Sequence, residues 1–435
     1  MTRRYPAYKD SGVEWLGEVP EGWDITRLGT CFSERREKVS DKDHPALSVT
    51  MGGIVPQIET AAKTDDGDNR KRVCKGDFVI NSRSDRKGSS GLSLLNGSVS
   101  LISIVLSPKG KIAGPFSNWL LKSQNFQDEF YRWGSGIVAD LWSTRYKDMK
   151  AITLALPPLP EQRAIAAFLD RETTKIDALV AEQRRLIDLL REKRQAVISH
   201  AVTRGLNPDA PLKSSGIDWL GDVPEGWEVM PLKRLTNEIT VGIVVEPSKY
   251  YAENGIPALR SLNVRPGQIV SDNLVFISAE ANELLQKSQL HSGDLVAVRT
   301  GQPGTCAVVE DDFAGCNCID LIIVRKPTTT DSHFLRWYLT SDVAVRQFVE
   351  GSGGAIQQHF NVGTAMELTV IVPPVADQTM IVAYLESLTA KLDALTATAE
   401  SAIDLLQERR AALISATVTG KIDVRHLVSK ETEAA

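Results

Sequence analysis

Residues 154–203 read LALPPLPEQRAIAAFLDRETTKIDALVAEQRRLIDLLREKRQAVISHAVT, and residues 370–419 read VIVPPVADQTMIVAYLESLTAKLDALTATAESAIDLLQERRAALISATVT. The second segment repeats the pattern of the first at an offset of 216 (370 − 154). Each segment begins with a short apolar stretch and a double proline, and neither contains a glycine or a proline after Pro160 or Pro374. Because these two residue types are the usual helix breakers, the pattern predicts two long helices.

Apolar side chains recur in both segments at spacings of three, four and seven, which is the seam of a coiled coil. At 1.5 Å per residue each helix would be on the order of 60 Å long. A helix with one apolar stripe needs a partner, and the other copy is at hand, so we expect a two-stranded antiparallel coiled coil. Two unrelated core helices are the alternative. The side chains predicted to pair are Ile176, Leu179, Leu186, Leu190, Val197, Leu392, Leu395, Leu406 and Leu413.

A second repeat precedes each globular region. SGVEWLGEVPEGW at residues 11–23 returns as SGIDWLGDVPEGW at residues 215–227, with ten of thirteen positions identical. The beginning and the end of the chain also resemble the two sides of the junction that follows the first helix. The sequence is therefore close to circularly symmetric, which predicts a pseudo-twofold arrangement. We expect the repeated phrase to be a docking element anchored by Trp15, Trp23, Trp219 and Trp227.

Two dissimilar regions, residues 28–152 and 232–369, lie between the repeats and are rich in Val, Ile, Gly and turn residues. Both contain a Gly-Asp turn that leads into an apolar strand. We expect a mixed α/β (α+β) chain with two globular domains separated by two long helices. The predicted divisions are a first globular domain at 1–153, a helical spacer at 154–206, a second globular domain at 207–369, a second spacer at 370–425 and a tail at 426–435.

The WLGxVPxGW phrase, the PPLPEQ-type helix start and the two diverged regions separated by similar helices together resemble the DNA specificity subunit of type I restriction-modification systems. The resemblance covers nearly the whole chain. It implies that the diverged regions are target recognition domains, each reading half of a bipartite site in double-stranded DNA. It also implies that the helices are spacers of fixed length on which two modification (methyltransferase) subunits dock.

The resemblance further implies that this chain binds no cofactor and carries no catalysis. The modification subunits would carry S-adenosylmethionine, and restriction/translocase subunits would use ATP and Mg²⁺. The residues agree, since the sequence contains neither a GxxxxGK[ST] phosphate loop nor an Asn/Asp-Pro-Pro-Tyr/Phe methyltransferase motif. A self-contained methyltransferase or nuclease and a coiled-coil scaffold that binds only proteins are the alternatives.

Bulk composition limits the remaining classes. The net charge of −5 argues against a nonspecific polycation, although a local basic face can still bind phosphate. Five cysteines, an odd number, suggest a reducing cytoplasm, and no apolar run approaches transmembrane length. The cluster Cys306, Cys316 and Cys318 lacks a CxxC pair and a nearby histidine, so we expect buried free thiols and no metal site.

DNA recognition needs cations for phosphates and forked or amide donors for base edges. The first region offers basic stretches at residues 82–88 and 142–147, and the second offers a loop after the Gly-Asp strand and a glycine-hinged loop with two amides and an imidazole. A basic run is also a common form of solvated surface. The candidate DNA contacts are Arg83, Arg86, Lys87, Ser89, Arg145, Lys147, Arg299, Gln302, Gln357, Gln358 and His359.

Overall fold

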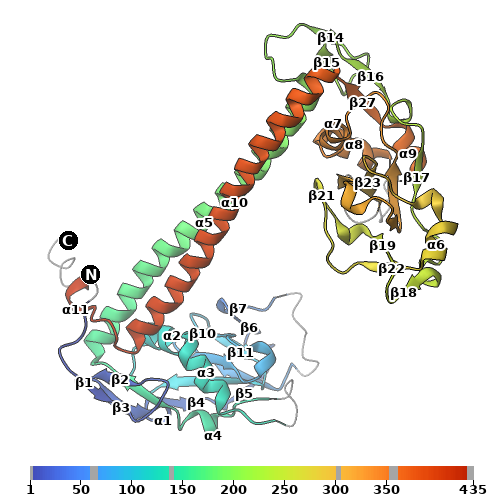
Figure 1. Ribbon diagram of the computed structural model, residues 1–435. Coiled ribbons are helices and arrows are strands. Elements are labelled where there is room, and N and C mark those ends of the chain that lie inside the picture. Colours follow the sequence, from blue (N-terminus) through green and yellow to red (C-terminus); the bar gives the residue numbers. More distant parts are fainter. Residues whose placement is uncertain (1–2, 59–66, 137–141, 300–304, 352–360, 429–435) are drawn as a thin grey trace. The chain divides into compact units, whose positions relative to one another are not determined.

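The computed structural model describes residues 3–58, 67–136, 142–299, 305–351 and 361–428. It divides into two compact units: unit 1 comprises residues 1–184 and 401–435, and unit 2 comprises residues 185–400. Two long helices, α5 (Leu159–Arg204) and α10 (Val375–Val418), each contribute to both units. The predicted mixed α/β chain, with two sheet-rich domains and a long helix pair, is confirmed (Figure 1). The finer domain divisions stay a prediction.

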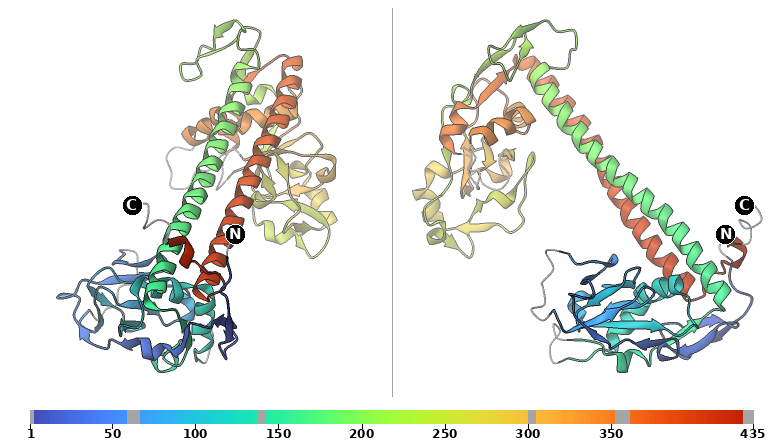
Figure 2. Two further views of the ribbon diagram at one scale, coloured as in Figure 1. Left: turned by 90° about the vertical axis from the view of Figure 1, so that its left-hand side faces the viewer. Right: turned by 180° about the vertical axis from the view of Figure 1, so that it is seen from behind.

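The helices α5 and α10 lie side by side and run in opposite directions (Figure 1, Figure 2). In unit 1, Arg410 Nε donates to Asp177 Oδ1 across the pair at 2.9 Å. In unit 2, Arg194 Nε lies 3.3 Å from Asp393 Oδ1. The offset of 216 converts one ion pair into the other, so each unit contains the same contact with the two helices exchanged. The antiparallel coiled coil predicted from the seam is confirmed.

The seam has the predicted spacing of apolar side chains, but at some positions the buried residue is the one after the residue that was predicted. We call this shift the phase of the seam. Ile176, Val180, Ile187 and Leu190 are all buried on α5, at steps of four, seven and three residues. The first step is therefore four residues, so the valine at 180 faces α10 and the leucine at 179 does not.

The pairing predicted for Leu179, Leu186 and Leu395 is consequently wrong, because these side chains are 50%, 42% and 53% exposed on the outer flank. Leu392 is buried in the seam. The remaining predicted side chains are half-buried, namely Val197, Leu406 and Leu413.

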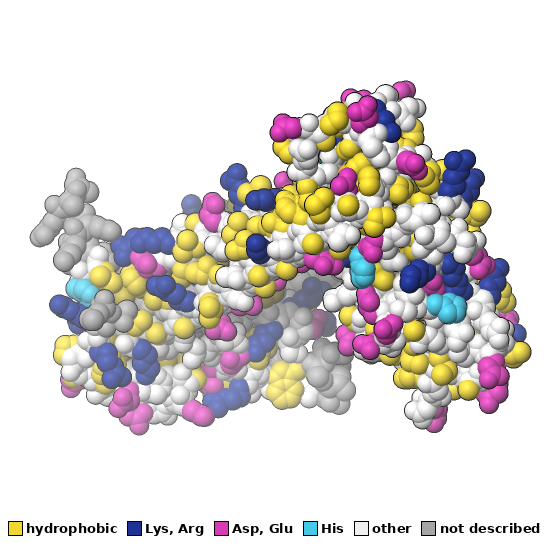
Figure 3. Space-filling model, turned by 45° about the horizontal axis from the view of Figure 1, so that its top comes forward, with side chains coloured by type: hydrophobic (Ala, Val, Ile, Leu, Met, Phe, Trp, Pro, Cys, Tyr) yellow, Lys and Arg dark blue, Asp and Glu magenta, His cyan; other side chains and the backbone are white. Residues whose placement is uncertain are grey.

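Exposed leucines occupy equivalent outer positions on the two helices. Leu179 corresponds to Leu395, and Leu189 corresponds to Leu405, in each case at the offset of 216. A band of hydrophobic side chains lies at the surface over the helices (Figure 3). Isolated surface leucines are common, but a repeated apolar flank on a helix pair is a surface suited to another protein.

The repeated tryptophan phrase caps the start of each long helix. In unit 1, β1 (Tyr8–Asp10) pairs with β2 (Glu18–Pro20), and in unit 2, β14 (Leu212–Ser214) pairs with β15 (Asp222–Pro224). After these hairpins, Trp23 Nε1 donates to Glu161 Oε1 at 3.1 Å, and Trp227 Nε1 donates to Asp377 Oδ2 at 3.0 Å. Both carboxylates lie in the first turn of a long helix, where negative charge is favourable.

The same tryptophans also contact the end of the opposite helix. Gly205, after α5, has a φ of 78°, and a Cβ added there would lie 3.1 Å from the Trp227 ring. Gly420, after α10, has a φ of 75°, and its added Cβ would lie 3.3 Å from the Trp23 ring. The phrase thus joins the start of one helix to the end of the other, as expected of a docking element.

The other two tryptophans of the repeat differ between the units. Trp15 is half-buried and meets Phe126 edge-on, with ring centroids 6.2 Å apart. Trp219 is 44% exposed. The anchor role predicted for Trp219 is therefore wrong: unit 2 leaves much of this ring uncovered.

The two globular regions share one sheet topology. In unit 1 the strand order is β10-β9-β12-β4, and in unit 2 it is β24-β23-β26-β17. The strands of the first sheet are β4 (Phe32–Glu34), β9 (Phe78–Asn81), β10 (Ser90–Leu92) and β12 (Ser103–Pro108). Those of the second are β17 (Ile239–Val241), β23 (Leu295–Val298), β24 (Cys306–Val308) and β26 (Leu321–Val324).

Helices and a linking strand pair complete the shared scaffold. The helices are α2 (Gly114–Lys122) and α3 (Gln124–Arg132) in unit 1, and α7 (Ser332–Leu339) and α8 (Asp342–Gly351) in unit 2. The strand that leads into each long helix pairs with the strand that follows the tryptophan phrase. These pairs are β13 (Thr153–Leu156) with β3 (Asp24–Arg27), and β27 (Thr369–Val372) with β16 (Glu228–Pro231).

Outside this scaffold the units diverge. Unit 1 adds the sheet β11-β8-β5 and the hairpin β6-β7, and unit 2 adds the sheet β18-β22-β19-β25 and the hairpin β20-β21. The unit 1 strands are β5 (Lys38–Val39), β6 (Leu47–Thr50), β7 (Gly53–Pro56), β8 (Arg70–Val73) and β11 (Gly97–Val99). The unit 2 strands are β18 (Tyr251–Ala252), β19 (Ile256–Leu259), β20 (Val264–Arg265), β21 (Gln268–Ile269), β22 (Val275–Ile277) and β25 (Asn317–Cys318).

The Gly-Asp turns belong to the scaffold. Asp77 is buried and accepts hydrogen bonds from the backbone N–H of Cys74 at 2.8 Å and from Arg35 Nε at 2.8 Å. Asp294 is also buried and accepts from the His291 N–H at 3.0 Å and from Arg325 at 2.7 Å. Each aspartate therefore closes its turn and pairs with one arginine, which explains why the motif occurs in both units.

The phase of the seam generates a stability prediction. Ile187→Ala should lower the free energy of unfolding by about 2–4 kcal/mol, because a buried Ile leaves a cavity. Leu186→Ala, one position away, should cost less than about 1 kcal/mol because much of that side chain is already exposed. Urea unfolding followed by circular dichroism of the helices would measure both. Equal losses would contradict the phase assigned here.

The cysteines generate a second prediction. All five are free, and Cys74 is the half-buried one whereas Cys31, Cys306, Cys316 and Cys318 are buried. Burial raises the pKa of Cys31 to about 11 and that of Cys306 to about 12, so their reactive thiolate forms are scarce at pH 8. Ellman's reagent should therefore modify Cys74 first, and Cys74→Ser should remove the fast phase. A fast phase that persists in this variant would show that a second thiol is accessible.

Candidate nucleic-acid interface

Two basic stretches that are far apart in the sequence lie against each other in unit 1. The loop after β9 carries Arg83, and its backbone forms a bridge with Ser143. The N–H of Ser84 donates to the Trp142 carbonyl at 3.0 Å, and the N–H of Thr144 donates to the Ser82 carbonyl at 3.0 Å. The predicted stretches 82–88 and 142–147 thus form one surface.

An open hollow of about 530 Å³ is lined by part of this surface. Arg145 and Lys147 line it from one stretch, and Arg36, Lys38 and Lys71 line it from β-strands and their connections. Five cations therefore line the hollow against one carboxylate, that of Glu34. The hollow has a clear positive excess although the whole chain has a net charge of −5.

The cations of the hollow differ in how strongly they are held. Arg36 Nε lies 2.6 Å from a Glu34 oxygen, and Lys71 Nζ lies 3.3 Å from the other oxygen and donates to the Ser103 carbonyl. Arg145 and Lys147 are exposed and form no ion pair with any described residue. Lys38 is also exposed and has no described ion pair, so Lys38, Arg145 and Lys147 are the cations best placed to contact an external anion.

Tyr146 positions Arg145 and Lys147. It begins the short helix α4 (Tyr146–Met149), for which Arg145 is the N-cap residue. Its hydroxyl donates to the Phe32 carbonyl at 2.9 Å, which fixes the turn against β4. The cations on either side therefore project from a fixed backbone.

The other predicted contacts of the first stretch have mixed surroundings. Arg83 and Arg86 are exposed, and Arg86 lies 3.7 Å from the neighbouring Asp85. Lys87 Nζ donates to Asp128 at 2.6 Å, so its charge is partly compensated. Ser89 is 7% exposed and its carbonyl accepts from the Asn81 N–H, because the chain is already re-entering the sheet there. The DNA contact predicted for Ser89 is contradicted by this burial.

Sequence reasoning missed two cations of the hollow, Arg36 and Lys38. The signal was present, since residues 34–38 read ERREK. However, the interleaved glutamates made this run look like an ordinary solvated surface.

In unit 2 the structure describes one predicted contact, Arg299. It follows β23, and its guanidinium donates to Asp320 at 2.6 Å with a quarter of the side chain exposed. This ion pair leaves Arg299 less available to a phosphate than Arg145. The predicted residues Gln302, Gln357, Gln358 and His359 lie outside the described residues.

The arrangement in unit 1 can bind a polyanion. Within the ranges that the structure describes, no group of three or more His, Cys, Asp and Glu side chains is placed to hold a metal ion. None of the described helices has the length and apolarity that a bilayer crossing requires. The chemistry that the described hollow offers is the binding of phosphates by exposed cations.

Comparison with known proteins places this architecture. The MjaVIII specificity subunit of a type I restriction enzyme from Methanocaldococcus jannaschii is 22% identical over 94% of this chain and 95% of its own length. The EcoKI specificity subunit from Escherichia coli K12 is 22% identical over 96% of this chain and 94% of its own length. The EcoBI specificity subunit from Escherichia coli is 25% identical over 69% of this chain and 67% of its own length. No family model matches the chain.

Solved structures share the fold. A chain from a structure of type I R-M complex assembly and conformational transition covers 92% of this chain and 98% of its own length, with a TM-score of 0.71 at 17% identity. The HsdS subunit from Thermoanaerobacter tengcongensis covers 93% of this chain and 98% of its own length, with a TM-score of 0.55 at 18% identity. The resemblance drawn from the repeats is confirmed: the curated homologues of this chain are type I restriction enzyme specificity subunits.

Proposed function

We propose that this chain, whose homologues are type I specificity subunits, reads a bipartite site in double-stranded DNA through its two globular regions. Each region contains the same four-stranded scaffold and different loops. Such a pair can recognise two different half-sites, because loop side chains determine base contacts whereas the scaffold determines their placement.

The observation that carries the proposal is the cationic hollow of unit 1. Arg145 and Lys147 are exposed, extend from a fixed turn and form no ion pair with another described residue. Cations in this state can neutralise DNA phosphates without first losing an internal partner, and they release counterions when they do so. The hollow is lined partly by β5 and β8, which lie outside the scaffold that the units share, and this favours a nucleic-acid reader over a scaffold that binds only proteins.

We further propose that the helix pair docks two modification subunits and serves as the spacer between the readers. The exposed leucines on the outer flank of α5 and α10 support the first part, because they form equivalent apolar surfaces on the two helices. The modification subunits would bring S-adenosylmethionine, and restriction/translocase subunits would use ATP and Mg²⁺. This chain would supply recognition and no catalytic group, and the assembled complex would be a DNA adenine methyltransferase and ATP-dependent endonuclease of the cytoplasm.

The cationic hollow generates a binding prediction. Arg145→Ala and Lys147→Ala should each weaken DNA binding, and the removal of one phosphate contact should reduce the slope of log affinity against log salt by about 1. Fluorescence anisotropy with a labelled duplex at several salt concentrations would measure both quantities. A base contact would instead cost about 1–3 kcal/mol at one position of the target.

Lys111→Ala provides the matched control. Lys111 is an exposed cation of unit 1 outside the lining of the hollow, so its removal changes the net charge equally. If all three variants bound DNA with the same affinity and salt slope, the hollow would not be the DNA surface. A scaffold or a self-contained enzyme would then have to be considered again, the latter by testing the purified chain for methylation or cleavage.

The spacer role generates a prediction about the target. Inserting four helix-forming residues between Thr203 and Gly205 should advance the chain by about 6 Å. At 3.4 Å per base pair this approaches two base pairs, so the spacer of the target should lengthen by one or two base pairs while both half-sites stay unchanged. Mapping of methylated adenines in cells that carry the variant and its partner subunits would test this. An unchanged spacer with full activity would show that α5 does not set the distance.

A further inference from the structure

The helix end in unit 1 contains a buried tyrosine from outside the repeat. Tyr5 is 6% exposed, and its hydroxyl donates to Glu161 Oε1 at 2.6 Å. Its ring meets the Trp23 ring edge-on, with centroids 5.9 Å apart and an interplanar angle of 77°. The Arg425 guanidinium lies over the ring, 4.9 Å from its centroid. One glutamate oxygen thus accepts from both the tryptophan of the repeat and this tyrosine.

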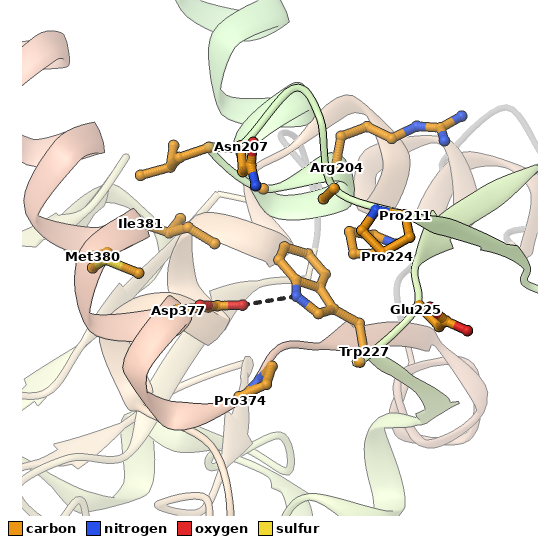
Figure 4. A pocket seen from close by; sticks show the side chains of 14 residues that line it. Arg204, Asn207, Pro211, Pro224, Glu225, Trp227, Pro374, Asp377, Met380 and Ile381 are labelled. Atoms are coloured by element: carbon orange, nitrogen blue, oxygen red, sulfur yellow. Dashed lines mark hydrogen bonds between the residues drawn. The ribbon is translucent and has the colours of Figure 1, made fainter.

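The equivalent place in unit 2 is an open pocket. It has a volume of about 500 Å³ and surrounds the tryptophan–carboxylate pair Trp227 and Asp377 (Figure 4). Met380 and Ile381 line it from α10, and Pro224 lines it from the end of β15. Among the described residues, the hydrogen bond from Trp227 is the one that the Asp377 side chain accepts.

The pocket is open because the chain takes a different route in unit 2. The offset of 204 that relates the two tryptophan phrases aligns Tyr5 with Asp209, which is exposed. The offset of 216 that relates the helices aligns Ile422, which packs against the unit 1 core, with Leu206, which is 40% exposed. Met380 is 56% exposed at the rim. Unit 2 therefore has the tryptophan and the carboxylate of the unit 1 contact but no counterpart of Tyr5.

We propose that this pocket receives a tyrosine side chain presented by a segment of a partner protein. The ring would lie against Trp227 and its hydroxyl would donate to the Asp377 carboxylate, as Tyr5 does with Trp23 and Glu161. The unit 2 residues that align with Pro6 and Ala7, namely Ala210 and Pro211, already line the pocket, so the aromatic side chain is the part of the contact that a partner would supply. The inference does not depend on the proposed DNA reading, since it rests on contacts at the helix end alone.

A peptide with the sequence of residues 3–7, RRYPA, is the probe. The full chain, labelled with ¹⁵N at its tryptophan indoles, would be titrated with the peptide, with the Trp227 signal assigned from Trp227→Phe. We expect a saturable shift of this signal with a dissociation constant of about 1 mM, as suits a single aromatic anchor. The peptide with Tyr5→Phe should bind about tenfold more weakly, because it cannot donate to Asp377.

Two variants of the full chain separate pocket binding from nonspecific association. Met380→Glu places a charge at the rim on an already exposed side chain, so it should abolish the shift without unfolding the protein. Ser387→Glu adds the same charge two turns further along α10 at another exposed position and should leave the shift unchanged.

The outcomes that would overturn the proposal are specific. Absence of a shift at the solubility limit of the peptide, or an equal shift in the Met380→Glu variant, would show that the pocket does not take this side chain. Equal affinity of the tyrosine and phenylalanine peptides would show that the tyrosine hydroxyl does not donate to Asp377. Self-association of the chain in sedimentation that Tyr5→Ala abolishes would identify a second copy as the occupant and overturn the assignment to a partner protein.

Discussion

The apolar seam between α5 and α10 is the interaction on which the rest of the structure depends. Helices of 46 and 44 residues with one apolar stripe each cannot bury it alone, so each requires the other. Because the pair is antiparallel, the start of one helix lies beside the end of the other in both units. The tryptophan phrase is needed twice for this reason. The rings of Trp23 and Trp227 each lie against the glycine at the end of one helix, and their indole N–H groups donate to the first-turn carboxylate of the other helix.

Much of this frame could be predicted because it occurs twice in the chain. Two 50-residue segments match at an offset of 216, and each is free of glycine and proline after the first turn of its helix. This leaves few alternatives to a pair of long helices. The phase of the seam was harder to predict, since Leu179 and Val180 are both apolar and a step of three or four residues fits the same count. Leucine is the more hydrophobic choice, yet the valine faces the partner helix. Both residues are apolar, so the sequence pattern alone does not distinguish the two phases.

The candidate site was predictable only in part, for a related reason. Basic residues are visible in any sequence, but their usefulness depends on which carboxylates lie beside them in the fold. Lys87 has Asp128 as a partner from α3, and Arg299 has Asp320 from another loop. Arg145 and Lys147 have no described carboxylate partner, and nothing in their local sequence distinguishes them from Lys87. Likewise, Ser89 is polar and follows a glycine, yet its carbonyl already accepts a hydrogen bond from the Asn81 N–H at the edge of the sheet.

An acidic chain can still bind an acidic polymer, because charge acts locally in salt water. The Debye length is about 8 Å at physiological ionic strength, so a phosphate in the hollow of unit 1 interacts mainly with the five cations and one glutamate that line it. The net charge of −5 is spread over a much larger surface and is largely screened from that point. A net charge of −5 is therefore compatible with the proposed binding of DNA at the hollow, whereas a uniformly basic surface would bind any duplex in any orientation.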